Sequence, residues 1–288
     1  MQEIAGDDRR GFVRRLAYAA ALLFALDVTS FNLSSIGILD PPALMFSLLF
    51  VYLLLEGRVI PASISMGLAL LCKLTSLTIL CALLLFLLLK SFHESGRVLL
   101  PALRRWFPVA ERVALISAAI LVAGLACFDY AYGVFNTPFE HLAFMYTYHS
   151  SLTFEASEDV SLPLSWVNPF NPGVPEMYYL ESVEVRTASG KLLRVGIIDY
   201  RGVQSPFWWM MWPALAVYPI ICFLKLRRGE FPEVEALFLC WILFSYFVYL
   251  PIAYLVRRIV YFFYFYLTVP ILAIVTPYWL REHRLILA

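Results

Sequence analysis

The sequence predicts an all-α integral membrane protein, with about eight transmembrane helices and one long extracytoplasmic loop. Hydrophobic residues make up 61% of the chain, and its mean hydropathy is +0.76, whereas a soluble domain is roughly 45–50% apolar. These residues gather in runs that approach the length of a bilayer crossing. Lys and Arg are distributed unevenly between alternate connections. The net charge of +1 gives no bulk basic character, so nucleic acid is not an expected partner.

Three parts follow from the distribution of apolar runs. Residues 1–131 hold about five spans, 132–205 form the extracytoplasmic loop, and 206–288 hold about three spans. A spanning helix needs about 20 mostly apolar residues. The candidate spans are 14–33, 41–56, 59–74, 75–91, 110–131, 206–225, 234–254 and 259–279. The second to fourth runs are short, which leaves tilted, re-entrant or broken helices open there.

The first run follows the arginine-rich stretch RRGFVRR, a pattern that is also typical of a signal peptide. No small-x-small cleavage site follows cleanly, and we interpret the run as a retained first helix with cytoplasmic arginines. In this orientation the short connections obey the positive-inside rule, and the reverse orientation violates it almost everywhere. We therefore expect both termini in the cytoplasm, at the plasma membrane of a prokaryote or at the endoplasmic reticulum.

Segment 97–112 mixes arginines with Leu, Trp and Phe, so a helix lying flat in the headgroup layer and a plain basic connector are both open. The five cysteines all fall in apolar runs without CxxC spacing. They are expected to be small core residues rather than disulfide partners or metal ligands.

The loop is the longest polar interval of the chain, and two elements are expected in it. FEHLAFMYTYH has helical spacing of its apolar positions, which predicts a short helix. SVEVRT and KLLRVGI alternate in polarity around a Gly-bearing turn, which predicts a β-hairpin.

Arg257 and Arg258 stand between two apolar runs, where a charge is costly unless it lies at an interface or meets an anion. The guanidinium fork suits phosphate. On a continuous helix Arg257 would share a face with Tyr254, Tyr261 and Tyr264. The pair is therefore a candidate lipid-phosphate site, and the alternative is a snorkelling interfacial pair.

Two more charges flank short apolar runs. Asp40 precedes Pro41–Pro42, which favours an N-cap of the following helix. It is also a candidate base or a partner for a substrate hydroxyl. Lys73 interrupts MGLALLCKLTSLTILC, where it could contact a phosphate or snorkel from a turn.

His141 and His149 flank MYTY in the loop, with Glu140 beside the first. No third and fourth ligands stand at metal-site spacing, so no metal site is expected. The histidines are candidates for hydrogen bonds to a sugar, a phosphate or a peptide, or for packing the loop. No Ser-His-Asp pattern, Walker loop or dinucleotide fingerprint is convincing.

Six collinear segments resemble motifs of the protein O-mannosyltransferases, which are GT-C membrane glycosyltransferases. They cover most of the chain and are SSIGILDPPALMFSLLFVYLLLEGR, SISMGLALLCKLTSLTILCALLL, MYTYHSSLT, SLPLSWVNPFNPGVPEMYYLE, GVQSPFWWMMWPAL and RRIVYFFYFYLTVP. The resemblance implies a GT-C-like partial bundle and a polyprenyl-phosphate (dolichyl) sugar donor. It also implies inverting transfer of the sugar to a hydroxyl, such as a protein Ser or Thr, outside the cytoplasm.

Carried over by motif, the resemblance places Asp40 near the site, His149 in the loop that covers it, and Lys73, Arg257 and Arg258 beside the lipid phosphate. Together with the residue patterns above, it gives the following candidate roles. The catalytic role falls to Asp40 or Glu140, if this chain supplies the base. The donor phosphate would be held by Lys73, Arg257, Arg258 and Tyr261. Contacts to the acceptor or sugar would come from the loop residues His141, Tyr148, His149 and Trp166. No covalently bound cofactor is implied, and metal dependence stays open.

The chain also departs from the family. The family's catalytic acidic pair lies in a luminal loop ahead of the Leu-Asp helix, and no Asp-Glu loop precedes that helix here. Three interpretations are open: a C-terminal part that works with a separate subunit supplying the N-terminal helices, a fragment, or an inactive relative. A non-catalytic structural or docking subunit of a membrane complex is the alternative function. A transporter is weaker, because no inverted repeat is evident.

Overall fold

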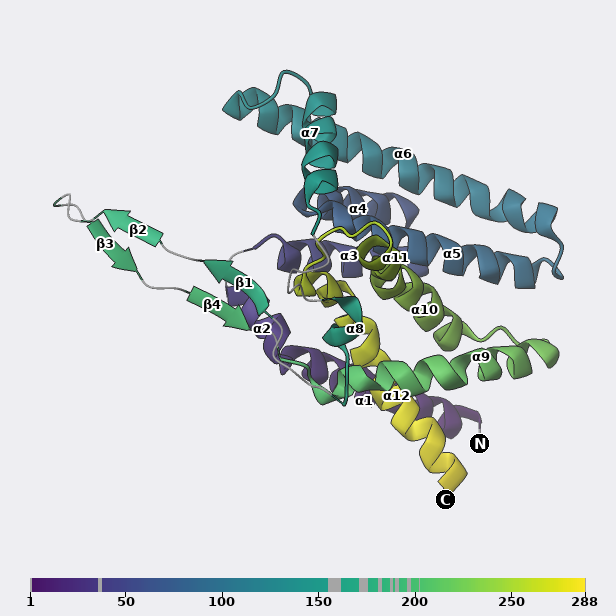
Figure 1. Cartoon of the computed structure of the whole chain (residues 1–288). Coiled ribbons are helices and arrows are strands. Elements are labelled where there is room, and N and C mark those ends of the chain that lie inside the picture. The colour runs from purple at the N-terminus through teal and green to yellow at the C-terminus, as the bar shows by residue number, and fades with distance from the viewer. Residues whose placement is uncertain are drawn as a thin grey trace.

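The computed structural model describes residues 2–35, 38–154, 162–170, 176–180, 183–186, 189, 192–195, 198–201 and 203–287. Before the long loop, the chain forms α1 (Gln2–Ala25), α2 (Val28–Ser35), α3 (Asp40–Leu55), α4 (Val59–Cys72), the 3₁₀ turn η1 (Leu74–Ser76), α5 (Leu77–Glu94) and α6 (Leu99–Tyr132). Figure 1 shows α6 along the outside of the bundle, with α4 and α5 against it and α3 beneath α4.

The described part of the loop contains two helices and two strand pairs. The helices are α7 (Pro138–Ser151) and the single turn α8 (Pro163–Trp166). The strands are β1 (Glu176–Leu180), β2 (Val183–Arg186), β3 (Leu192–Val195) and β4 (Ile198–Arg201). β1 pairs with β4, and β2 pairs with β3, both antiparallel. The inner pair joins Val183 to Val195 and Arg186 to Leu192, in the segment where the sequence predicts a hairpin. The β2–β3 pair projects away from the helices, whereas the β1–β4 pair lies closer to them and β1 contacts η4 (Figure 1).

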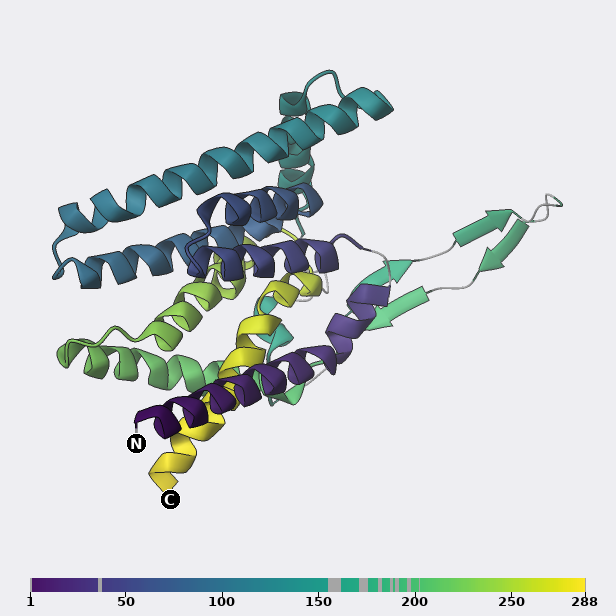
Figure 2. The same cartoon turned by 180° about the vertical axis from the view of Figure 1, so that it is seen from behind.

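After the loop the chain returns to the bundle. It forms η2 (Pro206–Met210), α9 (Met211–Arg227), α10 (Glu233–Ile242), the π-helical turn η3 (Leu243–Phe247), α11 (Tyr249–Tyr254), the 3₁₀ segment η4 (Phe262–Leu267) and α12 (Val269–Leu287). α12 packs along α1, and Figure 2 shows both termini at the same end of the molecule.

Four helical stretches in the described part of the chain are long and apolar enough to cross a membrane: Leu74–Glu94, Leu99–Tyr132, Pro206–Arg227 and Glu233–Tyr254. The pair Val13–Ala25 and Val28–Ser35, bent by 58°, would make a fifth span. α3, α4 and the first part of α12 are shorter apolar helices. These helices indicate an integral membrane protein, while the count of eight spans stays a prediction.

Two sequence-based expectations for the helices are wrong. Segment 97–112 is neither a separate flat helix nor a connector, because α6 runs unbroken from Leu99 through Pro108 to Tyr132. Its 34 residues extend over about 51 Å, well beyond the roughly 30 Å hydrocarbon core.

The predicted span 259–279 is also interrupted, since η4 separates the backbone around Arg257 from α12. Arg257 adopts the left-handed conformation with φ 53°. Tyr254, Arg257, Tyr261 and Tyr264 therefore do not form the predicted stripe along one continuous helix.

An aromatic core fixes the second half of the molecule. Trp166, Trp208, Tyr246, Phe262 and Phe265 are fully buried and lie against one another. They come from α8, η2, η3 and η4, so the end of the long loop is packed onto the bundle. This packing positions η4, which carries part of the candidate site.

Candidate functional site

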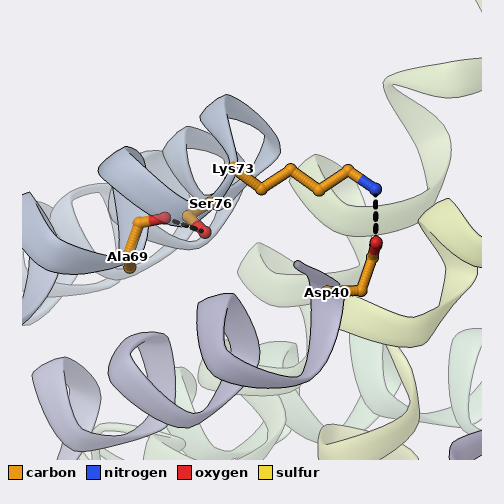
Figure 3. A network of polar contacts seen from close by, with 4 residues as sticks. All are labelled: Asp40, Ala69, Lys73 and Ser76. Carbon is orange, nitrogen blue, oxygen red and sulfur yellow. Dashed lines mark hydrogen bonds and ion pairs between the residues drawn. The ribbon is translucent and has the colours of Figure 1, made fainter. Parts of the chain in front are cut away.

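Asp40 and Lys73 meet at one end of the bundle. The Lys73 ammonium donates to both carboxylate oxygens of Asp40 at 2.6 Å (Figure 3). The Asp40 side chain is 8% exposed and the Lys73 side chain 23% exposed. The predicted N-cap role of Asp40 is wrong: Leu39 occupies that position, and no side chain caps α3. Asp40 lies in the first turn instead, where a negative charge also suits the helix dipole.

Lys73 reaches this position because the helical backbone is interrupted between α4 and η1. Its backbone is extended, with φ −160° and ψ 125°. The Ser76 hydroxyl donates across the break to the Ala69 carbonyl at 3.4 Å (Figure 3). The ammonium lies 4.1 Å from the ring centroid of Phe263 and 5.4 Å from that of Tyr264. Lys73 therefore joins the start of α3 to η4 by an ion pair and a cation–π contact.

Arg258 binds the end of α7. Its Nε donates to the His149 carbonyl at 2.7 Å, and its Nη2 lies 3.2 Å from His149 Nδ1. A guanidinium only donates, so this Nδ1 accepts and the imidazole is neutral with its proton on Nε2. The backbone reinforces the contact, since Ile259 donates to the Leu152 carbonyl at 2.9 Å. The loop helix is thereby tied to the segment before η4.

The charges around His149 bear on its protonation. Partial burial and the positive charges of Arg258 and Lys73 lower the pKa of His149 below its ordinary value of 6.5. Lys73 lies 5.4 Å from the Tyr264 ring centroid, and Arg258 hydrogen-bonds to the Tyr264 side chain, so the Asp40–Lys73 pair and the Arg258–His149 pair both adjoin Tyr264. Four residues that are far apart in sequence thus converge at this end of the bundle.

The sequence missed Tyr249, which pairs with Tyr264 of the predicted phosphate site. Their rings stack with centroids 5.1 Å apart, and Tyr249 is 3% exposed. The Tyr249 hydroxyl has no hydrogen-bond partner among the described residues, although Asp40 and Arg258 lie close enough to act on it electrostatically. A buried hydroxyl without a partner costs about 1–3 kcal/mol. No sequence signal distinguishes Tyr249 from its aromatic neighbours.

Three further predicted residues lie at the rim of this site. Arg257 is exposed, and its backbone carbonyl accepts from Phe154 N–H at 3.0 Å. Tyr261 is partly exposed and stacks on Phe263 at a centroid distance of 5.0 Å. Tyr148 is 52% exposed next to His149.

The other predicted residues have structural contacts elsewhere. Glu140 accepts from the Asn136 backbone N–H at 3.1 Å, while its own N–H donates to the Thr137 hydroxyl, which together cap α7. His141 Nδ1 lies 2.8 Å from an Asp129 carboxylate oxygen and fastens α7 to α6. Trp166 is fully buried in the aromatic core. No described contact brings these three side chains to Asp40 or Arg258.

The assembled group combines two cationic side chains, a carboxylate, a neutral imidazole and two phenols. Such a group can hold an anion on the guanidinium and ammonium and orient a hydroxyl on the carboxylate. Among the residues that the structure describes, no three His, Cys, Asp or Glu side chains lie together in a way that could hold a metal ion.

No family model, no curated protein and no solved structure matches the chain. The function is therefore inferred from the site and from the motifs that resemble protein O-mannosyltransferases.

Proposed function

We propose that the chain is a membrane glycosyltransferase, or the C-terminal part of one. It would transfer a sugar from a polyprenyl-phosphate donor to a hydroxyl, such as a protein Ser or Thr, on the extracytoplasmic face. The observation that carries the proposal is the convergence of Asp40, Lys73, His149 and Arg258 at one end of the bundle. These residues fall in four of the six segments that resemble the family's motifs.

In the proposed reaction the cations hold the donor phosphate. Arg258 uses N–H groups that His149 does not engage, and Lys73 turns from Asp40 toward the phosphate. The acceptor oxygen attacks the anomeric carbon, and the bond from that carbon to the phosphate oxygen breaks. The electron pair leaves with the polyprenyl phosphate, whose charge the two cations stabilise.

The movement of Lys73 from Asp40 to the phosphate would also free the catalytic base. While Asp40 is paired with Lys73, both carboxylate oxygens accept from the ammonium and are engaged. When the phosphate draws Lys73 away, the carboxylate becomes free to take the proton of the acceptor hydroxyl. The loop helix α7 would cover the bound sugar, with His149 Nε2–H as a donor and Tyr148 beside it.

The adjacent arginines offer a matched test. The full chain in native membranes is assayed for binding of dolichyl-phosphate mannose and for transfer of mannose to a Ser/Thr-rich peptide. Donor binding is measured separately, because a separate subunit supplying the N-terminal helices is one of the open interpretations. Arg258→Gln is expected to reduce donor use about 100-fold, whereas Arg257→Gln, with the same change at the rim, has a smaller effect.

The double variant Arg257→Ala with Arg258→Ala is expected to lose donor use almost completely. Unchanged donor binding and transfer in this double variant would overturn the phosphate assignment.

A non-catalytic docking subunit is the second candidate. The observation that favours it is that both predicted carboxylates are already engaged, Asp40 with Lys73 and Glu140 in the cap of α7. Purification in mild detergent separates the two functions. A co-purifying subunit with two helices and an Asp-Glu loop supports a split enzyme, and an unrelated membrane complex supports docking.

A further inference from the structure

A cavity of about 540 Å³ opens at the other end of the bundle, between the ends of α5, α9 and α10. Its lining is mainly apolar and includes Phe92, Cys222, Phe223 and Leu239. The described lining contains no Asp or Glu. An apolar cavity of this size accommodates part of an acyl chain rather than a sugar.

Two arginines stand among the lining residues. Arg97 adopts a left-handed backbone with φ 66°, and its guanidinium donates to the Leu226 carbonyl near the end of α9. The Arg227 guanidinium lies 5.6 Å from the ring centroid of Phe223. Within the described part of the chain neither forms an ion pair. Both therefore keep N–H groups available for an anion.

Two carboxylates of α10 bind lysines and not these arginines. Glu233 binds Lys90 at 2.6 Å, and the buried Glu235 binds Lys225 at 2.5 Å. A further polar atom, His93 Nδ1, is buried without a hydrogen-bond partner among the described residues. The cavity thus combines an apolar interior, two guanidiniums outside any described ion pair, and an imidazole nitrogen without a described hydrogen-bond partner.

We propose that this cavity binds one phospholipid with an anionic headgroup. An acyl chain occupies the apolar part, and the phosphate meets Arg97 and Arg227, whose planar forks suit phosphate oxygens. The 18 residues of α5 rise about 27 Å, close to the roughly 30 Å hydrocarbon thickness. The cavity is therefore about one bilayer away from Lys73, and the proposal is independent of the proposed sugar transfer.

In the orientation that the sequence predicts, this end faces the cytoplasmic leaflet, whose anionic lipids attract Lys and Arg by about 1 kcal/mol each. Removing one guanidinium is therefore expected to weaken lipid binding about fivefold, and removing both by about 25-fold.

Native mass spectrometry of the full chain tests the proposal. Detergent-purified protein is titrated with phosphatidylglycerol or with phosphatidylcholine of the same acyl chains. Phosphatidylglycerol is expected to be retained preferentially, and Arg97→Gln with Arg227→Gln is expected to abolish the preference. The control is Arg104→Gln with Arg105→Gln, which removes two exposed arginines of α6 that do not line the cavity. Equal retention of the two lipids, or an equal loss in the control, would overturn the proposal.

The unmodified protein provides a second readout that does not depend on the folding of a variant. Cys222 lines the cavity, whereas Cys127 is exposed on α6 and does not line it. Phosphatidylglycerol is expected to slow maleimide labelling of Cys222 severalfold relative to Cys127, and phosphatidylcholine is not. Labelling of Cys222 at the same relative rate in both lipids would contradict occupancy of the cavity.

Discussion

At the scale of single residues, the Asp40–Lys73 ion pair connects two helices through side chains that are mostly withdrawn from solvent. Removing one partner leaves the other charge in a poorly solvated position, which costs about 3–5 kcal/mol for a fully buried pair. Lys73 retains some exposure, so the cost here lies near or below the lower end of that range.

We therefore predict that Asp40→Asn or Lys73→Met each lowers the free energy of unfolding by about 2–3 kcal/mol. Asp40→Asn combined with Lys73→Met should recover more than half of that loss, because no unpaired charge remains. Denaturant titration in mixed micelles measures all four proteins as a double-mutant cycle. Strictly additive losses would show that the pair contributes no coupling.

His149 gives a pH dependence whose sign follows from its lowered pKa. The unfolded chain binds the imidazole proton more readily than the folded chain in the interval between the two pKa values. Stability therefore rises with pH there, and it is lost as pH falls from the unfolded value of about 6.5 through the lower folded pKa. Protonation also removes the acceptor that faces the Arg258 guanidinium.

We predict that thermal stability falls more steeply between pH 7 and pH 5 in the unchanged protein than in His149→Gln. The difference between the two profiles isolates His149 from other titrating groups. Parallel profiles would rule out a contribution of this imidazole.

The sequence identified Asp40, Lys73 and Arg258 because a charge between apolar runs is expensive. It could not identify their partners, since Lys73 meets Asp40 across 33 positions and Arg258 meets His149 across 109. For Glu140 a local signal was present: Thr137-Pro-Phe-Glu140 has the spacing of a capping box, and the structure places both residues in the cap. The isolated hydroxyl of Tyr249 depends on three-dimensional packing and leaves no such signal.

At the scale of helices, α4 and α6 approach closely at a glycine. A Cβ on Gly67 would lie 2.6 Å from Ile120 Cβ and 3.1 Å from the Ser117 carbonyl oxygen. The Ser117 hydroxyl also donates to the Ser63 carbonyl at 2.9 Å across the same interface. Small residues and interhelical hydrogen bonds are typical of helix pairs inside membranes.

We predict that Gly67→Ala lowers the free energy of unfolding by about 2 kcal/mol, because Ile120 Cβ and a backbone oxygen cannot move aside independently. Gly124→Ala, at the same pair of helices, is the control. Its Cβ would meet only the Leu71 side chain, whose methyl ends can change rotamer. Denaturant titration should show the smaller loss for Gly124→Ala, and equal losses would contradict this account of the interface.

Apolar runs predicted α3, α4 and α5 nearly to their ends because each run lies between charged residues or turns. The same reasoning failed where tertiary contacts decide the backbone. Residues 255–261 are apolar and aromatic enough for a helix, yet Arg257 has a left-handed backbone and Arg258 forms an isolated β-bridge with Thr153. In α6 the error was the reverse, since the span was predicted to begin at 110 and the helix begins at Leu99.

At the scale of the whole molecule, the two polar regions occupy opposite ends of the same helices. Lys73 and Arg258 lie near the start of α5 and the end of α11, whereas Arg97 and Arg227 lie at the far ends of α5 and α9. The termini are together at one end, and α7 with the strands extends from the other (Figures 1 and 2). This arrangement agrees with a membrane protein whose donor site and lipid cavity face different leaflets.

We predict that α7 is outside the cytoplasm, and that the α9–α10 connection and the N-terminal helix are inside. With the five native cysteines replaced by serine, single cysteines are introduced as Tyr148→Cys, Arg228→Cys and Arg14→Cys, all at exposed positions. A membrane-impermeant maleimide should label position 148 in intact cells or sealed right-side-out vesicles, and positions 228 and 14 only after permeabilisation. The reverse pattern would invert the orientation but keep the two ends distinct. Labelling of 148 and 228 from the same side would contradict the two-ended arrangement itself, because α5, α9 and α10 would then fail to separate the donor site from the lipid cavity.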